Sequence, residues 1–370
     1  MKKHNGYIAL WKFIFAVGIL LFHCAKKLDY GDSVPAHFLY ASIGVDFFFL
    51  VSGYLLMKKT ESERERGDDR PLAEATVSFI RGKAEAIFPY LLLSWLLRLF
   101  VELLFERPGA TEVLESFFAE LMFLVSAAKP DYILNSVTWY VSAMLLAMLL
   151  IYPLCRKYGR GFALIIAPLI GLFVGGFLVR EYSSLSLRDW KKNTGFMTLG
   201  LMKAVAEISL GTFVYMLSEK LKMVRFTRFG RLTLMLLGNA ALGAVFIVNL
   251  GSKNVWEYDI LFVLLLMSGI GLCFSDEMLF DREMRNGFCY FLEKVSLPFY
   301  LNNFILIRLA NRTERLLKMS LKERYALVLI GNFLLSVLSL SLVEGIRRAV
   351  KKRREKTRLR EDPAADTVGQ

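Results

Sequence analysis

Long apolar runs constrain this sequence more than any other feature. In about ten places roughly 20 consecutive residues are predominantly apolar, which is the length that a helix needs to cross a hydrocarbon layer about 30 Å thick. Hydrophobic residues make up 55% of the chain, and the mean hydropathy is +0.44. One or two soluble cores could not bury so much apolar surface. We therefore predict an all-α, polytopic transmembrane bundle.

The predicted topology has about ten transmembrane helices and places both termini in the cytoplasm. Lys and Arg are more numerous in the segments assigned to that side than in the external loops, as the positive-inside rule requires. We interpret a weaker apolar run at 113–127 as a partly buried external excursion. The predicted spans lie near residues 7–25, 38–57, 84–105, 137–154, 162–179, 198–218, 232–250, 257–276, 289–310 and 325–346.

We divide the chain into a transmembrane domain, residues 1–346, and a basic tail, residues 347–370, expected to be cytoplasmic and partly disordered. The net charge of +13 comes partly from this tail. A basic cluster next to a membrane helix is typical of anchoring at an anionic leaflet, so the charge needs no nucleic-acid partner. We expect a multi-pass protein of the inner (plasma) membrane that contacts lipid and could form a homo-oligomer.

The Cys and His residues show no metal-binding pattern. The cysteines lie mostly in or beside apolar runs, where packed thiols are expected. The histidines are too scattered in the sequence to predict a metal site. These residues are Cys24, Cys155, Cys273 and Cys289, and His4, His23 and His37.

The first predicted helix carries two ionisable residues, Lys12 and His23. Such residues are costly inside a bilayer and are therefore functional candidates. Their spacing of 11 residues puts both on one helix face, about 16 Å apart along the axis. His is well suited to general-base chemistry near neutral pH. The alternative is that Lys12 extends to the interface and that His23 simply lies at the outer membrane surface.

The second predicted helix contains Asp46 in the run from Gly44 to Tyr54. A carboxylate in an apolar helix needs a partner or a wet cavity. Gly44 and Gly53 would allow close helix approach. Asp46 could therefore serve chemistry, or could simply accept hydrogen bonds at a tight helix crossing.

These motifs resemble the acyltransferase-3 family, whose members are integral membrane proteins that transfer acyl groups, often acetyl from acetyl-CoA, to extracytoplasmic carbohydrates. The resemblance rests first on a basic residue eleven positions before His23 and on the run Gly44–Tyr54. Weaker matches follow in the expected order over roughly residues 6–346. They are Phe79–Lys83 before Ile87–Tyr90, Trp139–Met144, Ala204–Gly211 and Ser296–Leu301.

The resemblance implies an O-acetyltransferase that uses acetyl-CoA as acyl donor and a carbohydrate or glycolipid as acceptor, with no metal. His23 would be the general base, and Asp46 would orient it or stabilise its imidazolium. The cations expected to bind the donor phosphates are Lys12, Arg81 and Lys83. Arg81 and Lys83 could equally be topology-setting charges. Candidate substrate-binding or pore-lining residues are Ser52, Trp139, Tyr140, Glu207, Tyr300 and Asn303.

Two positions depart from the family pattern. Lys12 stands where Arg is usual, which keeps the charge but loses the bidentate fork. Asn302 and Asn303 follow Tyr300–Leu301 where the family often has His, and Asn cannot titrate. Two other functions therefore remain open, a transporter or flippase for a lipid-linked sugar and a non-catalytic assembly partner. The absence of a clear two-half hydropathy repeat weighs against transport.

Other intramembrane charges are predicted to be mainly structural. Arg98 and Glu102 are four residues apart in the third span and should pair with each other. Glu207 and Arg308 are better pore-lining candidates, although each could be a structural partner. Trp139 and Trp190 are expected at membrane interfaces, where aromatic residues are common.

Overall fold

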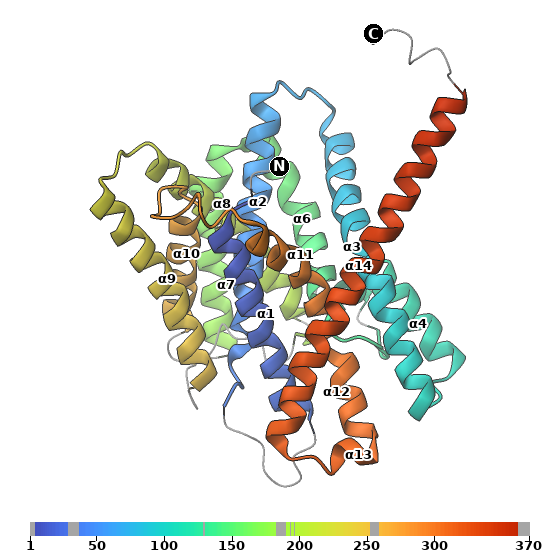
Figure 1. The fold of residues 1–370 in the computed structure, drawn as a ribbon. Helices are drawn as coiled ribbons and strands as arrows, with labels where there is room; N and C mark the ends of the chain where they lie inside the picture. Colours follow the sequence, from blue (N-terminus) through green and yellow to red (C-terminus); the bar gives the residue numbers. More distant parts are fainter. Residues whose placement is uncertain are drawn as a thin grey trace.

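The computed structural model describes residues 4–361, apart from residues 29–36, 129, 183–189, 193, 196 and 252–258. The described residues form fourteen α-helices and no β-strand (Figure 1). These helices are α1 (Gly6–Lys27), α2 (Gly44–Glu65), α3 (Leu72–Phe105), α4 (Ala110–Leu121), α5 (Val125–Ala128), α6 (Thr138–Tyr158), α7 (Ala167–Tyr182), α8 (Leu199–Lys222), α9 (Arg228–Gly251), α10 (Asp259–Cys273), α11 (Gly287–Leu301), α12 (Asn303–Arg312), α13 (Glu314–Leu317) and α14 (Leu321–Glu361). A 3₁₀ turn (Ala41–Ile43) leads into α2, and a π-helical turn (Phe162–Ile166) leads into α7.

The predicted polytopic bundle is confirmed. Eight of the described helices are long and apolar enough to cross a membrane. The two other predicted spans correspond to α10, which has 15 residues, and to the pair α11–α12. α1 begins and α14 ends at the same end of the bundle (Figure 1), as an even number of crossings requires. By the positive-inside prediction this is the cytoplasmic end, and the opposite end is called the outer end below.

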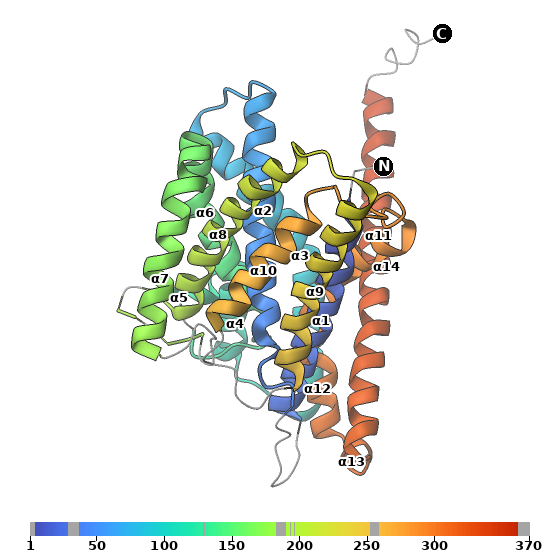
Figure 2. The same cartoon turned by 90° about the vertical axis from the view of Figure 1, so that its left-hand side faces the viewer.

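Burial separates an inner set of helices from an outer one. The most apolar windows of α2, α6 and α8 are 67%, 72% and 78% buried, whereas those of α7 and α9 are each 22% buried. α7 and α14 lie at opposite edges of the bundle, and α14 continues beyond it (Figure 2). The basic residues 347–361 continue α14 without a break. Residues 362–370 lie outside the described residues.

Backbone contact between α2 and α8 forms the centre of the bundle. A Cβ added at Gly53 would collide with the carbonyl oxygen of Ile208, and one added at Gly211 would collide with that of Leu50. Gly44 similarly lies against α1, close to the Phe15 carbonyl and Ile19. The predicted role of Gly44 and Gly53 in close helix approach is therefore confirmed.

The predicted span 289–310 is wrong as a single helix, because the chain breaks at Asn302 between α11 and α12. Pro298 lacks an N–H group, and its ring disturbs the preceding turn. The Leu301 carbonyl at the break accepts hydrogen bonds from Ser94 Oγ (2.7 Å) and Asn135 Nδ2 (2.9 Å). A break at membrane depth is tolerated where protein groups satisfy the freed backbone atoms.

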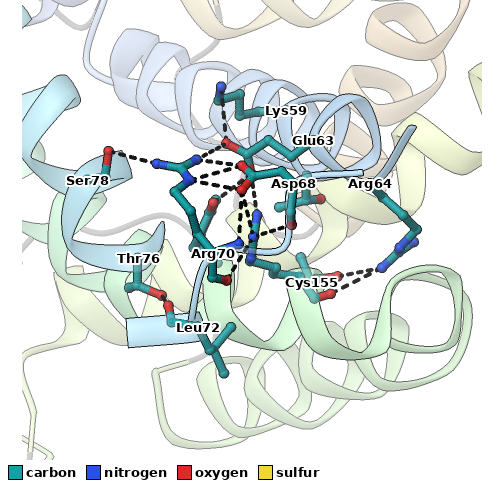
Figure 3. Close-up of polar contacts among 12 residues, drawn as sticks. Lys59, Glu63, Arg64, Asp68, Arg70, Leu72, Thr76, Ser78 and Cys155 are labelled. Carbon is teal, nitrogen blue, oxygen red and sulfur yellow. Dashed lines mark hydrogen bonds and ion pairs between the residues drawn. The ribbon is translucent and has the colours of Figure 1, made fainter. Parts of the chain in front are cut away.

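Charged side chains clamp the cytoplasmic ends of α2, α3 and α6 (Figure 3). Glu63 accepts from Tyr152 (2.6 Å) and from Arg156 (3.2 Å). Asp68 pairs with Arg70 at 2.5 Å and with Arg156 at 3.3 Å. The Arg70 guanidinium beside Asp68 holds the pKa of that carboxyl well below its usual range. The clamp fixes the spacing of three helices that surround the cavity described below.

Gly53→Ala should destabilise the protein by about 1–3 kcal/mol, because the added methyl group would separate α2 from α8. Thermal unfolding in detergent measures the effect. Gly82→Ala is the matched control, since a Cβ at Gly82 meets nothing within 4 Å and Ala is the better helix former. Equal melting temperatures for the two variants would contradict the tight crossing.

Candidate active site

A cavity of about 260 Å³ lies inside the bundle between α1, α2, α3, α6 and α11. Its walls are largely apolar, and its polar lining groups include cations that lie toward the cytoplasmic end of their helices. Five of the predicted site residues line it, namely Lys12, Ser52, Lys83, Tyr140 and Tyr300. The sequence places these residues on five different helices, and the fold brings them to one space.

Lys12 lines this central cavity as one half of an ion pair. Its Nζ lies 3.2 Å from Oε1 of Glu293 on α11, and the two side chains are 16% and 35% exposed. Lys83 also lines the cavity, with its ammonium group 5.7 Å from the centroid of the Phe79 ring. Arg81 is placed differently. It lies on the exposed face of α3, with a side chain that is 76% exposed and paired with Glu85.

Aromatic rings form the wall of the cavity toward its outer end. Tyr140 packs against Tyr300 with ring centroids 5.4 Å apart, and against Phe48 at 6.2 Å. The hydroxyls of Ser52 and Tyr140 both donate to the sulfur of Met144, at 3.5 and 3.7 Å. A thioether is a weak acceptor, so the carbonyl oxygen of a ligand could replace it at either hydroxyl.

His23 lies near the outer end of α1, is partly buried and is not among the cavity-lining residues. Its ring packs against Phe304 of α12, with centroids 4.6 Å apart. Within the described residues the imidazole has no hydrogen-bond partner. Phe48 lines the cavity and also packs against the apolar cluster around the outer half of α1, which includes Leu20 and Cys24. Phe48 therefore borders both the central cavity and the apolar cluster on the outer half of α1.

Asp46 has a different partner from the one that the sequence predicted. Its carboxylate lies 2.6 Å from Nζ of Lys203 on α8, and the same ammonium group lies 3.3 Å from Glu207. All three side chains are at most 6% exposed. Glu207 is thus part of this buried charge cluster and does not line the central cavity. Sequence reasoning missed Lys203, although a Lys four residues before Glu207 in an apolar helix was a usable signal.

Asn303 is the first residue of α12 and directly precedes Phe304, which packs against His23. It is fully buried, and its Oδ1 lies 3.5 Å from Asn332 Nδ2. Asn332 in turn donates to the Phe299 carbonyl at 2.9 Å. Within the described part of the chain Asn303 Nδ2 has no partner, which leaves a buried donor close to Phe304.

Several other predictions can be compared with the structure. Arg98 and Glu102 pair at 2.5 Å as predicted, and Arg308 joins them by donating to Glu102 at 2.7 Å.

Trp139 stacks on Trp190, with ring centroids 5.3 Å apart, and is not a cavity-lining residue. All four cysteines are buried, as predicted. The described residues contain no group of His, Cys, Asp or Glu side chains that could hold a metal ion.

The sequence was compared with protein families, curated proteins and solved structures. The family model described as an acyltransferase domain matches residues 5–343. The chain belongs to the acyltransferase-3 family. No curated protein and no solved structure matches it. The match covers nearly the whole chain and includes every helix that contributes to the central cavity.

Glu120 of α4 holds the chain segment that leads into α6. Its carboxylate accepts from the backbone N–H groups of Leu134 (2.8 Å) and Asn135 (3.1 Å), and from the hydroxyls of Ser116 (2.7 Å) and Thr138 (3.1 Å). These bonds position the start of α6, which carries the cavity residue Tyr140. Burial raises the pKa of Glu120 to about 7, although the hydrogen bonds act in the opposite direction.

Lys203→Met should lower the free energy of unfolding by about 3–5 kcal/mol, because it leaves Asp46 and Glu207 buried without their cation. Adding Asp46→Asn to Lys203→Met should recover part of this loss. A double-mutant cycle of thermal unfolding gives the coupling energy, expected to exceed about 1 kcal/mol. A coupling near zero would show that Asp46 depends on some other partner.

The raised pKa of Glu120 predicts that this residue destabilises the folded state as the pH rises from about 4.5 to about 7, by roughly 3 kcal/mol in total. The loss occurs on raising the pH because the buried carboxyl must then ionise. Glu120→Gln should abolish this component. Melting temperatures of both proteins between pH 5 and 8 test it, and parallel pH profiles would contradict it.

Proposed function

We propose that this protein is a membrane-embedded O-acetyltransferase that transfers acetyl from acetyl-CoA to a hydroxyl of an extracytoplasmic polysaccharide or glycolipid. The observation that carries the proposal is the central cavity in a chain of the acyltransferase-3 family. The cavity extends from two lysines on α1 and α3 to the aromatic wall of Tyr140 and Tyr300. His23 lies on the same helix as Lys12, 11 residues farther toward the outer end.

The two ends of the cavity suit the two ends of the donor. Acetyl-CoA is polyanionic at its nucleotide end, and Lys12 and Lys83 supply positive charge on the side from which a cytoplasmic donor would enter. The remaining wall is mainly apolar, with Leu55, Ile87 and Met148 among its residues. Such a wall can accept the slender pantetheine arm while the thioester approaches the hydroxyls of Ser52 and Tyr140.

His23 acts in this proposal as general base. It takes the proton from the acceptor hydroxyl as that oxygen attacks the thioester carbonyl. The carbon–sulfur bond then breaks, the new ester forms, and the proton passes from the imidazole to the departing CoA thiolate. The described contacts assign no carboxylate to His23, so the ring is positioned by packing against Phe304. Asn303 Nδ2 offers a neutral donor that could stabilise developing negative charge.

We expect Phe48 to move when donor and acceptor meet, because it borders both the central cavity and the apolar cluster that includes Leu20 and Cys24. A layer of aromatic rings can admit an acetylated thiol arm by rotamer change. The match to an acyltransferase family over residues 5–343 supports acyl transfer over the movement of a glycolipid across the membrane.

His23→Ala should reduce acetyl transfer by about 10²–10⁴-fold, the contribution that a positioned general base makes. The assay supplies radiolabelled acetyl-CoA and cell-envelope carbohydrate acceptors to protein in proteoliposomes. His37→Ala is the matched control, because this exposed histidine also belongs to the outer end but lies outside the proposed site. Undiminished transfer by His23→Ala would remove His23 from the mechanism.

A further inference from the structure

A second, smaller cavity of about 100 Å³ adjoins the central one on the cytoplasmic side. The two cavities share three lining residues, Lys12, Leu55 and Glu293. The ion pair between Lys12 and Glu293 is therefore part of their common wall. We call the smaller space the vestibule.

The vestibule presents polar groups where the central cavity presents mainly apolar ones. Its lining includes His4, Lys58 and Arg285. Nη2 of Arg285 donates to Asp276 (2.7 Å) and to Asp281 (2.5 Å), which hold the guanidinium in place. Nε of Arg285 and Nε2 of His4 are buried and make no hydrogen bond within the described chain. The vestibule thus combines cationic side chains with polar atoms that still lack partners.

A cationic cavity beside the clamp is less suitable for an anionic ligand of the central cavity. A cavity of about 470 Å³ beside the clamp is lined by Arg64, Arg70 and Arg156, and it shares no lining residue with the central cavity. A ligand bound there would therefore share no wall with the central cavity.

We propose that the vestibule binds the phosphate-bearing nucleotide end of the acyl donor, with Lys58, Arg285 and His4 as its binding residues. The pantetheine arm then passes the Lys12–Glu293 pair into the central cavity. Guanidinium and ammonium groups are the side chains that form strong, charge-assisted hydrogen bonds to phosphate. This inference rests on the proposed function, because it assumes a CoA thioester as donor.

The test compares a whole donor with one that lacks the nucleotide. Dissociation constants of acetyl-CoA and acetyl-pantetheine are measured on the full-length protein in detergent, with adenosine 3′,5′-bisphosphate as competitor. The variants are Lys58→Ala, which changes an exposed side chain, and Lys58→Ala combined with Arg285→Gln. Arg66→Ala is the control, an exposed cation at the end of α2. Melting temperatures establish that each variant is folded.

We expect the vestibule variants to lose the part of the acetyl-CoA affinity that comes from the nucleotide. Each lost charge-assisted contact should weaken acetyl-CoA binding by about tenfold, while acetyl-pantetheine binds as it does to the wild type. Competition by adenosine 3′,5′-bisphosphate should weaken in parallel, and Arg66→Ala should change nothing.

Two other results would overturn the inference, and they are distinguishable. If the folded vestibule variants keep the wild-type preference for acetyl-CoA over acetyl-pantetheine, the nucleotide site lies elsewhere and the proposed function stands. If the wild type binds neither donor, the proposed function itself fails.

Discussion

The backbone contact between α2 and α8 is the constraint on which the rest of the structure depends. Gly53 and Gly211 bring the two helices together, and the buried pair Asp46–Lys203 fixes their register. Once this face of α2 is turned toward α8, another part of its surface borders the central cavity, whose other walls come from α1, α3, α6 and α11. That part carries Ser52 and Leu55. One crossing thus decides which side chains of α2 line the central cavity.

The break between α11 and α12 has a comparable effect at the outer end. Tyr300, before the break, lines the central cavity, and Phe304, after it, packs on His23. In a continuous helix the backbone carbonyls of this segment would have accepted hydrogen bonds from N–H groups of the same helix. The break instead ties the Leu301 carbonyl to Ser94 and Asn135. The segment is therefore anchored by protein groups that replace the missing intrahelical bonds.

Much of the fold was predictable, because apolar runs determine the membrane spans and local spacing determines which side chains of one helix meet. Span length follows from the thickness of the bilayer, and the pair Arg98–Glu102 follows from a separation of four residues on one helix. The residues around the central cavity were largely predictable as well, since the motif carrying Lys12 and those containing Ser52, Tyr140 and Tyr300 belong to the family resemblance.

The long-range partners were not predictable from these patterns. Periodicity shows which face of a helix a residue occupies, but it does not show which helix lies opposite. Asp46 was expected near His23 and instead meets Lys203, and Lys12 meets Glu293 on α11. The break at Asn302 was also missed, because the Asn pair was interpreted as a departure from the family pattern and not as the end of a helix.

The central claim is that one path joins the cytoplasmic vestibule to His23 through the central cavity. A cryo-electron microscopy structure of the full-length protein with bound acetyl-CoA tests it most directly. The account predicts density for the nucleotide in the vestibule and for the pantetheine arm between Lys12 and Lys83, with the thioester at the level of Tyr140 and pointing toward His23. Donor density in the cavity beside Arg64 and Arg156, with the central cavity empty, would contradict it.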